Sequence, residues 1–103
     1  YMSVLTKILP LLFVSAIAVA DALAEPIKLG WIGPLTGNNS IIGSDAQIST
    51  QLAVNEINAA GGIRGRPLEL FIEDDSYAPK KTLTSYASLK DAKGVRLFMV
   101  YSY

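Results

Sequence analysis

Three short apolar runs alternate with two segments of helical periodicity, and this alternation leaves few folds open to the chain. The apolar runs span residues 27–32, 68–72 and 95–100, and we predict that each forms a strand. Residues 44–60 and 79–93 carry apolar side chains at helical spacing. A β-α-β-α-β order with connectors of a few residues favours parallel strands joined by right-handed crossovers. The sequence therefore predicts an α/β fold of three layers, in which helices cover both faces of a parallel sheet.

The ends of the two predicted helices carry recognisable signals. Ser44 opens an S-x-x-Q capping box, and Gly61 and Gly62 suit the end of the same helix. Pro79 suits the first position of the second helix, which should end at Gly94. In the first helix, the face expected to pack on the sheet holds Ala46, Thr50, Ala53, Ile57 and Ala60. In the second helix, the side chains that recur at helical spacing are Leu83, Tyr86, Ala87 and Lys90.

A glycine-rich loop over residues 33–43 joins the first predicted strand to the first helix. Ligands of open α/β sheets bind beyond the carboxyl ends of the strands, where this loop should lie. Free amides and a helix N-terminus there could cradle an anion. However, the loop lacks both the G-x-G-x-x-G spacing of a dinucleotide site and the Gly-Lys-Ser/Thr ending of a P-loop. Two interpretations stay open, namely one wall of a solute cleft and an ordinary strand-to-helix turn.

Glu73, Asp74 and Asp75 follow the second predicted strand. Three consecutive carboxylates point in different directions, which suits neither a magnesium cage nor a catalytic acid–base pair. We therefore interpret them as solvated residues of a turn and a helix start. We also expect Asp74 or Asp75 to fix the turn by accepting hydrogen bonds from nearby amides.

The composition excludes several classes of function. The chain has no cysteine, which excludes disulfides and thiolate zinc sites, and no histidine, the usual general base near neutral pH. The hydroxyls of Thr36, Ser40 and Ser102 are therefore expected to hydrogen-bond a ligand rather than to act as nucleophiles. Nine basic and nine acidic residues leave no net charge to attract nucleic acid or anionic membranes. We expect no catalytic residue, no metal and no cofactor.

The first 24 residues have the layout of a secretory signal peptide. A lysine precedes an apolar stretch at residues 8–20, and a small-residue site follows that would be cleaved after Ala24 to leave Glu25 first. A buried helix or a membrane anchor is the alternative, although an aspartate closes the run before the roughly 20 residues of a spanning helix. The predicted organisation is a signal at 1–24 and the first part of a larger lobe at 25–103, located in the periplasm or secreted.

Two stretches of the chain carry a resemblance to a known family. The sequences IKLGWIGPLTG at 27–37 and NEINAAGGIRGRPLEL at 55–70 resemble the periplasmic solute-binding proteins of ABC importers, of the branched-chain amino acid type. The resemblance implies the type I periplasmic-binding fold, in which two α/β lobes close about a hinge on a small solute. It also implies an amino acid or amide as the solute, an importer permease as the partner, a monomer at full length and no enzymatic activity.

The predicted ligand contacts lie in the loops after the first and third strands. The resemblance implies an apolar contact late in the first loop, which matches Ile42, and hydroxyls or amides after the third strand, which match Ser102 or lie just past Tyr103. Thr36 and Gly37 belong to the first loop, and Tyr101 follows the third strand at the same edge of the sheet. The predicted ligand-binding residues are Thr36, Gly37, Ile42, Tyr101 and Ser102.

Two other functions stay open beside an exported binding protein that works by hinge closure. A sensor or receptor domain of the same fold would carry a transmembrane or signalling segment further along the chain. An enzyme on a Rossmann-like sheet would need a nucleotide fingerprint or a general base, and the sequence holds neither.

Overall fold

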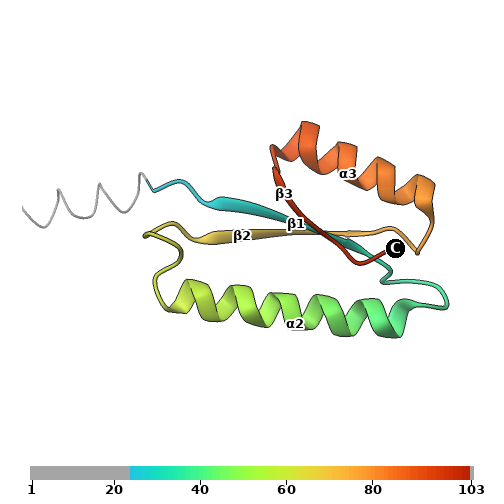
Figure 1. Ribbon diagram of the computed structural model, residues 1–103, viewed down its shortest axis with the longest axis horizontal. Coiled ribbons are helices and arrows are strands. Elements are labelled where there is room, and N and C mark those ends of the chain that lie inside the picture. Colours follow the sequence, from blue (N-terminus) through green and yellow to red (C-terminus); the bar gives the residue numbers. More distant parts are fainter. Residues whose placement is uncertain (1–23, 103) are drawn as a thin grey trace, which may run out of the picture.

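In the computed structural model, which describes residues 24–102, two helices enclose a parallel sheet (Figure 1). The elements in chain order are β1 (Ile27–Gly33), α2 (Ser40–Ala59), β2 (Leu68–Asp74), α3 (Pro79–Lys93) and β3 (Leu97–Val100). α2 packs on one face of the sheet and α3 on the other. The predicted element order and three-layer α/β fold are confirmed. The predicted signal peptide, except for Ala24, and Tyr103 lie outside the described residues.

β1 is the central strand of the sheet, whose order is β2-β1-β3 with both pairings parallel. Its residues Trp31 and Ile32 are buried, as expected for a strand covered on both faces. β2 runs two residues past its predicted end because Glu73 and Asp74 still pair with β1. β3 begins two residues later than predicted because the amide of Val95 donates to the carbonyl of Leu89 (3.1 Å), which closes α3 instead.

α2 begins at Ser40, four residues before the predicted capping box, so the prediction that Ser44 caps the helix is wrong. Asn39 occupies the N-cap position and makes no side-chain capping hydrogen bond. Gly43 explains the earlier start, since the absence of a side chain lets the first turn of α2 approach β1 closely. A Cβ atom at this position would lie 1.6 Å from the carbonyl oxygen of Pro34. The β1–α2 loop is therefore only residues 34–39, and Gly43 is a helix-packing residue.

The packed face of α2 differs in part from the prediction. Gly43 and Val54 are its buried residues, whereas Ala53, Ile57 and Ala60 are exposed. α2 lies over β1 and β2, so its side toward β3 remains open. Ala53 and Ile57 line an apolar hollow of about 390 Å³ there. The predicted apolar face of α2 is present, but within residues 24–102 the sheet covers only one side of it.

Asn58 joins α2 to the start of β2. Its side-chain amide donates to the carbonyl oxygen of Leu68 (2.9 Å), and its side-chain oxygen accepts from the amide of Leu68 (2.7 Å). The helix ends at Ala59, and Gly61 and Gly62 follow with φ of 104° and 78°. Only glycine adopts this backbone region freely, so the predicted glycine end of the helix is confirmed.

α3 has the predicted ends, with Pro79 in its first turn and Gly94 in the left-handed conformation (φ 70°) at its C-cap. Its buried residues are Ser85 and Leu89. Leu83 and Tyr86, from the predicted helical repeat, are exposed. Leu89 completes a core cluster with Ile32 and Val95, against which two phenylalanine rings, Phe71 and Phe98, are packed. Neither helix in the described part of the chain is long and apolar enough to cross a membrane.

Candidate functional site

The loops that follow the three strands meet at one edge of the sheet (Figure 1). Parallel register puts Gly33 of β1 beside Asp74 of β2, and Ile32 of β1 beside Val100 of β3. The amide of Tyr101 extends this pairing by donating to the carbonyl of Ile32 (2.7 Å). The carboxyl edge of a parallel sheet is where α/β proteins bind ligands. It is therefore the candidate site, and it holds the predicted residues of the first loop and of the segment after β3.

Asp74 connects two of these loops through its carboxylate. Oδ1 accepts hydrogen bonds from the amides of Leu35 (2.8 Å) and Ser76 (2.9 Å), and Oδ2 accepts one from the hydroxyl of Thr36 (2.7 Å). Partial burial would raise the pKa of the Asp74 carboxyl, but these hydrogen bonds outweigh it and hold the pKa below its ordinary value. Asp74 is therefore ionised at neutral pH and bridges the loop after β1 to the turn after β2.

Thr36 is exposed, but its hydroxyl is already engaged inside the protein. Beside its bond to Asp74, its oxygen lies 2.7 Å from the hydroxyl oxygen of Ser76. A hydroxyl has one proton to donate, and that proton goes to the Asp74 carboxylate. A ligand at this position would therefore have to donate to Thr36.

Asp75 is fully buried, so its interpretation as a solvated residue is wrong. Its Oδ1 accepts from the amide of Tyr77 (2.9 Å) and its Oδ2 accepts from the hydroxyl of Thr82 (2.6 Å), one turn into α3. The expectation that an aspartate fixes the turn is confirmed for both Asp74 and Asp75. The N-cap residue Ala78 makes no side-chain capping hydrogen bond, and Asp75 instead ties the turn before α3 to the side chain of Thr82 in its first turn.

The environment of Asp75 favours its charged form. Burial would raise the pKa of this carboxyl, and the neighbouring Asp74 charge acts in the same direction. Hydrogen bonding from Thr82 and Tyr77 outweighs both and lowers the pKa below its ordinary value. The Ser102 hydroxyl lies close to this carboxylate, but within residues 24–102 its oxygen makes no hydrogen bond.

The structure places the remaining predicted ligand residues around the same edge. Ser102 is buried beside Asp75, whereas Tyr101 is about half exposed (49 %). Gly37 is exposed with φ of 87°, and its carbonyl accepts from the amide of Ser40 (3.2 Å). Ile42 is exposed (57 %), but it lies in the first turn of α2 and not in the loop. The structure thus brings the loop residues and the residues after β3 to one edge, and their contacts with a ligand remain a prediction.

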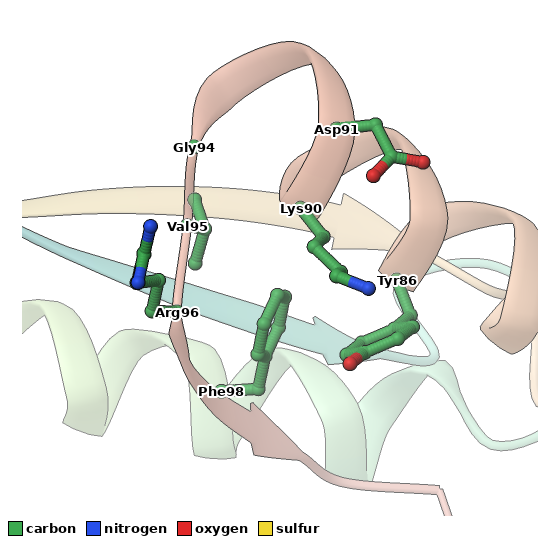
Figure 2. Close-up of a pocket in the computed structure, with 7 residues that line it drawn as sticks. All are labelled: Tyr86, Lys90, Asp91, Gly94, Val95, Arg96 and Phe98. Carbon is green, nitrogen blue, oxygen red and sulfur yellow. The ribbon is translucent and has the colours of Figure 1, made fainter.

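A separate hollow of about 470 Å³ lies between α3 and the beginning of β3 (Figure 2). Tyr86 and Phe98 line it with rings 4.7 Å apart and tilted by 53°, and the Lys90 ammonium lies 6.0 Å from the centre of the Tyr86 ring. Gly94, Val95 and Arg96 precede β3, at the opposite end of that strand from the three loops, and none of the predicted ligand residues lines this hollow. It is therefore not the candidate solute site. Within residues 24–102, no three acidic side chains converge as a metal site would require.

Sequence relatives and solved structures resemble this chain. The Leu/Ile/Val-binding protein BraC3 of Rhizobium johnstonii is 35% identical over 79 residues, which is 77% of this chain and 22% of that protein. A solved structure of a branched-chain amino acid ABC transporter protein from Silicibacter pomeroyi is 34% identical and superposes with a TM-score of 0.70, over 73% of this chain and 19% of the other.

A second solved structure shows a protein of this kind with its ligand. The branched-chain amino acid transporter substrate-binding protein LivJ of Streptococcus pneumoniae, in complex with isoleucine, is 33% identical with a TM-score of 0.66. The alignment covers 68% of this chain and 20% of that protein. The chain thus spans about a fifth of the length of these relatives. Since the sequence model for periplasmic binding proteins also matches residues 26–103, across every strand and helix described above, the chain belongs to the periplasmic binding protein family.

Proposed function

We propose that this chain forms one wall of the solute cleft of an exported binding protein, which delivers an amino acid or a related small solute to an ABC importer. The observation that carries the proposal is the convergence of three loops, with Thr36, Ser76 and Tyr101, at the carboxyl edge of the sheet. The Streptococcus pneumoniae protein, which shares this fold, is in complex with isoleucine. A branched-chain amino acid is therefore the first ligand to test.

The proposed mechanism is closure of a second lobe over this wall. A solute that contacts both lobes stabilises the closed form, because those contacts are complete only when the lobes meet. On this wall, Ile42 would provide an apolar contact, Thr36 would accept a hydrogen bond, and Tyr101 would lie at the rim. The buried Ser102 would mark the floor of the cleft beneath Tyr101.

The remaining parts of the proposal concern export and partners. The signal-like sequence supports secretion with cleavage between Ala24 and Glu25, which would release a periplasmic protein. The relatives are named as binding and transporter proteins, which supports a role in binding rather than catalysis. The membrane partner would be the permease of the importer, and the full-length protein would act as a monomer.

A chimaera tests whether this wall can bind a solute. Residues 26–103 would replace the matching segment of the Streptococcus pneumoniae protein, so that the relative supplies the other lobe. We expect isothermal titration calorimetry to show saturable binding of isoleucine. Ile42→Asp, which places a charge at the proposed apolar contact, should weaken binding about tenfold or more because an unpaired carboxylate would have to be desolvated.

Lys90→Ala serves as the control because Lys90 lines the separate hollow away from the three loops. It should leave isoleucine affinity within about twofold, since additive effects are expected for distant sites. A chimaera with native circular dichroism that binds none of isoleucine, leucine and valine would contradict the proposed branched-chain ligand.

A further inference from the structure

We propose that Asp74 is a positioning residue for the solute cleft, whose carboxylate holds the β1–α2 loop against the turn after β2 in the form that meets the solute. This inference rests on the proposed function. Asp74 is placed at the end of β2, directly beside Gly33 at the end of β1. From there its side chain reaches a loop that lies 38 and 39 residues away in the sequence, at Thr36 and Leu35.

The geometry requires a group that accepts several hydrogen bonds at once. Oδ1 accepts from the amides of Leu35 and Ser76, one on each side of the edge, and Oδ2 accepts from the hydroxyl of Thr36. An ionised carboxylate is acceptor-only, so both oxygens can serve. Hydrogen bonds to a charged acceptor are also stronger than those between neutral groups. A side-chain amide in this place would keep one acceptor oxygen and lose the other.

The turn on the other side of the bridge has an unfavourable backbone. Ser76 and Tyr77 have φ of 50° and 60°, in the left-handed region that residues other than glycine seldom adopt. Such a conformation persists when neighbouring contacts determine it, and the bond from the Ser76 amide to Asp74 is one of them. Asp74 therefore fixes both of the segments that it connects.

An ordered loop binds a solute at lower cost than a loop that must be ordered on binding. Thr36 is the clearest case. Its hydroxyl donates its one hydrogen bond to Asp74, so only the lone pairs of its oxygen remain for a ligand. Without Asp74, the Thr36 hydroxyl would be free to donate to Ser76 or to a ligand, and the loop would lose the two bonds that join it to the end of β2. Asp74 thus acts on the solute through the loop and does not need to touch it.

Asp75 provides a matched comparison one residue away. It too is a carboxylate held by amide and hydroxyl donors, but these come from Tyr77 and Thr82, in the turn and in α3. Within residues 24–102, its side chain makes no hydrogen bond to the β1–α2 loop. Replacing a carboxylate with a purely structural role should lower stability alone. Replacing a carboxylate that positions the loop should also lower the order of the β1–α2 loop and the affinity for the solute.

Amide hydrogen exchange in the full chain tests the bridge itself. In Asp74→Ala, we expect the Leu35 amide to exchange about tenfold faster or more, relative to the amide of Ile63, which bonds to Arg66 far from this edge. In Asp75→Asn, the same ratio should stay within about twofold. An unchanged Leu35 ratio in Asp74→Ala would overturn the inference.

Isoleucine affinity in the chimaera tests the consequence for the cleft. Asp74→Ala should weaken binding about tenfold or more, Asp74→Asn less because its oxygen still accepts from both amides, and Asp75→Asn by no more than about twofold. Equal losses in Asp74→Ala and Asp75→Asn would show a structural role only and overturn the inference. If the unsubstituted chimaera binds none of isoleucine, leucine and valine, the proposed branched-chain ligand is contradicted, and the exchange ratio alone decides whether Asp74 positions the loop.

Discussion

Gly43→Ala is expected to destabilise the fold by about 3 kcal/mol, at the upper end of the cost of overpacking a well-packed site. The added Cβ would lie 1.6 Å from the Pro34 carbonyl oxygen and 2.9 Å from the Pro34 ring, so α2 would have to move away from the end of β1. The direction of the change in stability tests the close packing, because alanine in place of glycine normally stabilises a helix interior by roughly 0.5–1 kcal/mol. Urea unfolding followed by the fluorescence of Trp31, the only tryptophan and a buried one, measures the change.

Glu56→Ala is the matched control, because Glu56 is exposed on the same helix. It should change the free energy of unfolding by no more than about 0.5 kcal/mol. If Gly43→Ala instead stabilises the protein, α2 does not approach Pro34 closely and the assignment of Gly43 as a helix-packing residue is wrong.

Asp75→Ala is expected to cost about 2–3 kcal/mol of unfolding free energy at neutral pH. The substitution leaves the partly buried amide of Tyr77 without its side-chain acceptor and removes the shorter of the two bonds made by the Thr82 hydroxyl. Thr82 keeps a second bond to the carbonyl of Ala78 (3.1 Å), which limits the loss. Glu73→Gln is the control, because it changes a carboxylate in the same acidic trio that has no recorded hydrogen bond within residues 24–102, and should change stability by under about 0.5 kcal/mol.

The contribution of Asp75 should depend on pH in a defined direction. Its pKa is lower in the folded protein than in the unfolded chain, where an aspartate carboxyl titrates at about 3.9. The stabilisation is therefore complete above that unfolded value and is lost as the pH falls through the folded pKa. The difference in unfolding free energy between the native chain and Asp75→Ala should shrink from pH 7 to about pH 3. A difference that grows on acidification would mean that the folded protein favours the protonated carboxyl.

The overall fold could be predicted because local and global signals agree along most of the chain. Pro79 and Gly94 bound α3 as their backbone preferences require, and Gly61 and Gly62 end α2 for the same reason. The parallel order followed from the alternation of strands and helices. These features are determined by residues that lie close together in the sequence, so they can be predicted from the sequence alone.

The errors arose where distant contacts override local preference. Ser44 has the local pattern of a cap, but close packing between Gly43 and Pro34 lets α2 start earlier. Asp75 has the pattern of a solvated turn residue, but Thr82 and Tyr77 satisfy its charge in a buried position. The threonine seven residues after Asp75 is a weak signal for this bond, because it becomes meaningful only when the turn geometry is known.

The candidate site was predicted by topology more than by residue chemistry. The rule that loops at the carboxyl edge hold ligands placed Thr36, Gly37, Tyr101 and Ser102 around one edge of the sheet. The bridge from Asp74 to Leu35 and Thr36 was missed, because nothing in the sequence relates residues that far apart. Parallel register between β1 and β2 is what brings them together.

The most direct test of the proposed cleft is a crystal structure of the chimaera with isoleucine bound. We expect the ligand at the carboxyl edge of the sheet, with its side chain against Ile42 and its polar groups within hydrogen-bond distance of Thr36 or of the segment Tyr101–Ser102. Isoleucine held entirely by the other lobe, or seated in the hollow between Tyr86 and Phe98, would contradict the assignment of these loops as one wall of the cleft.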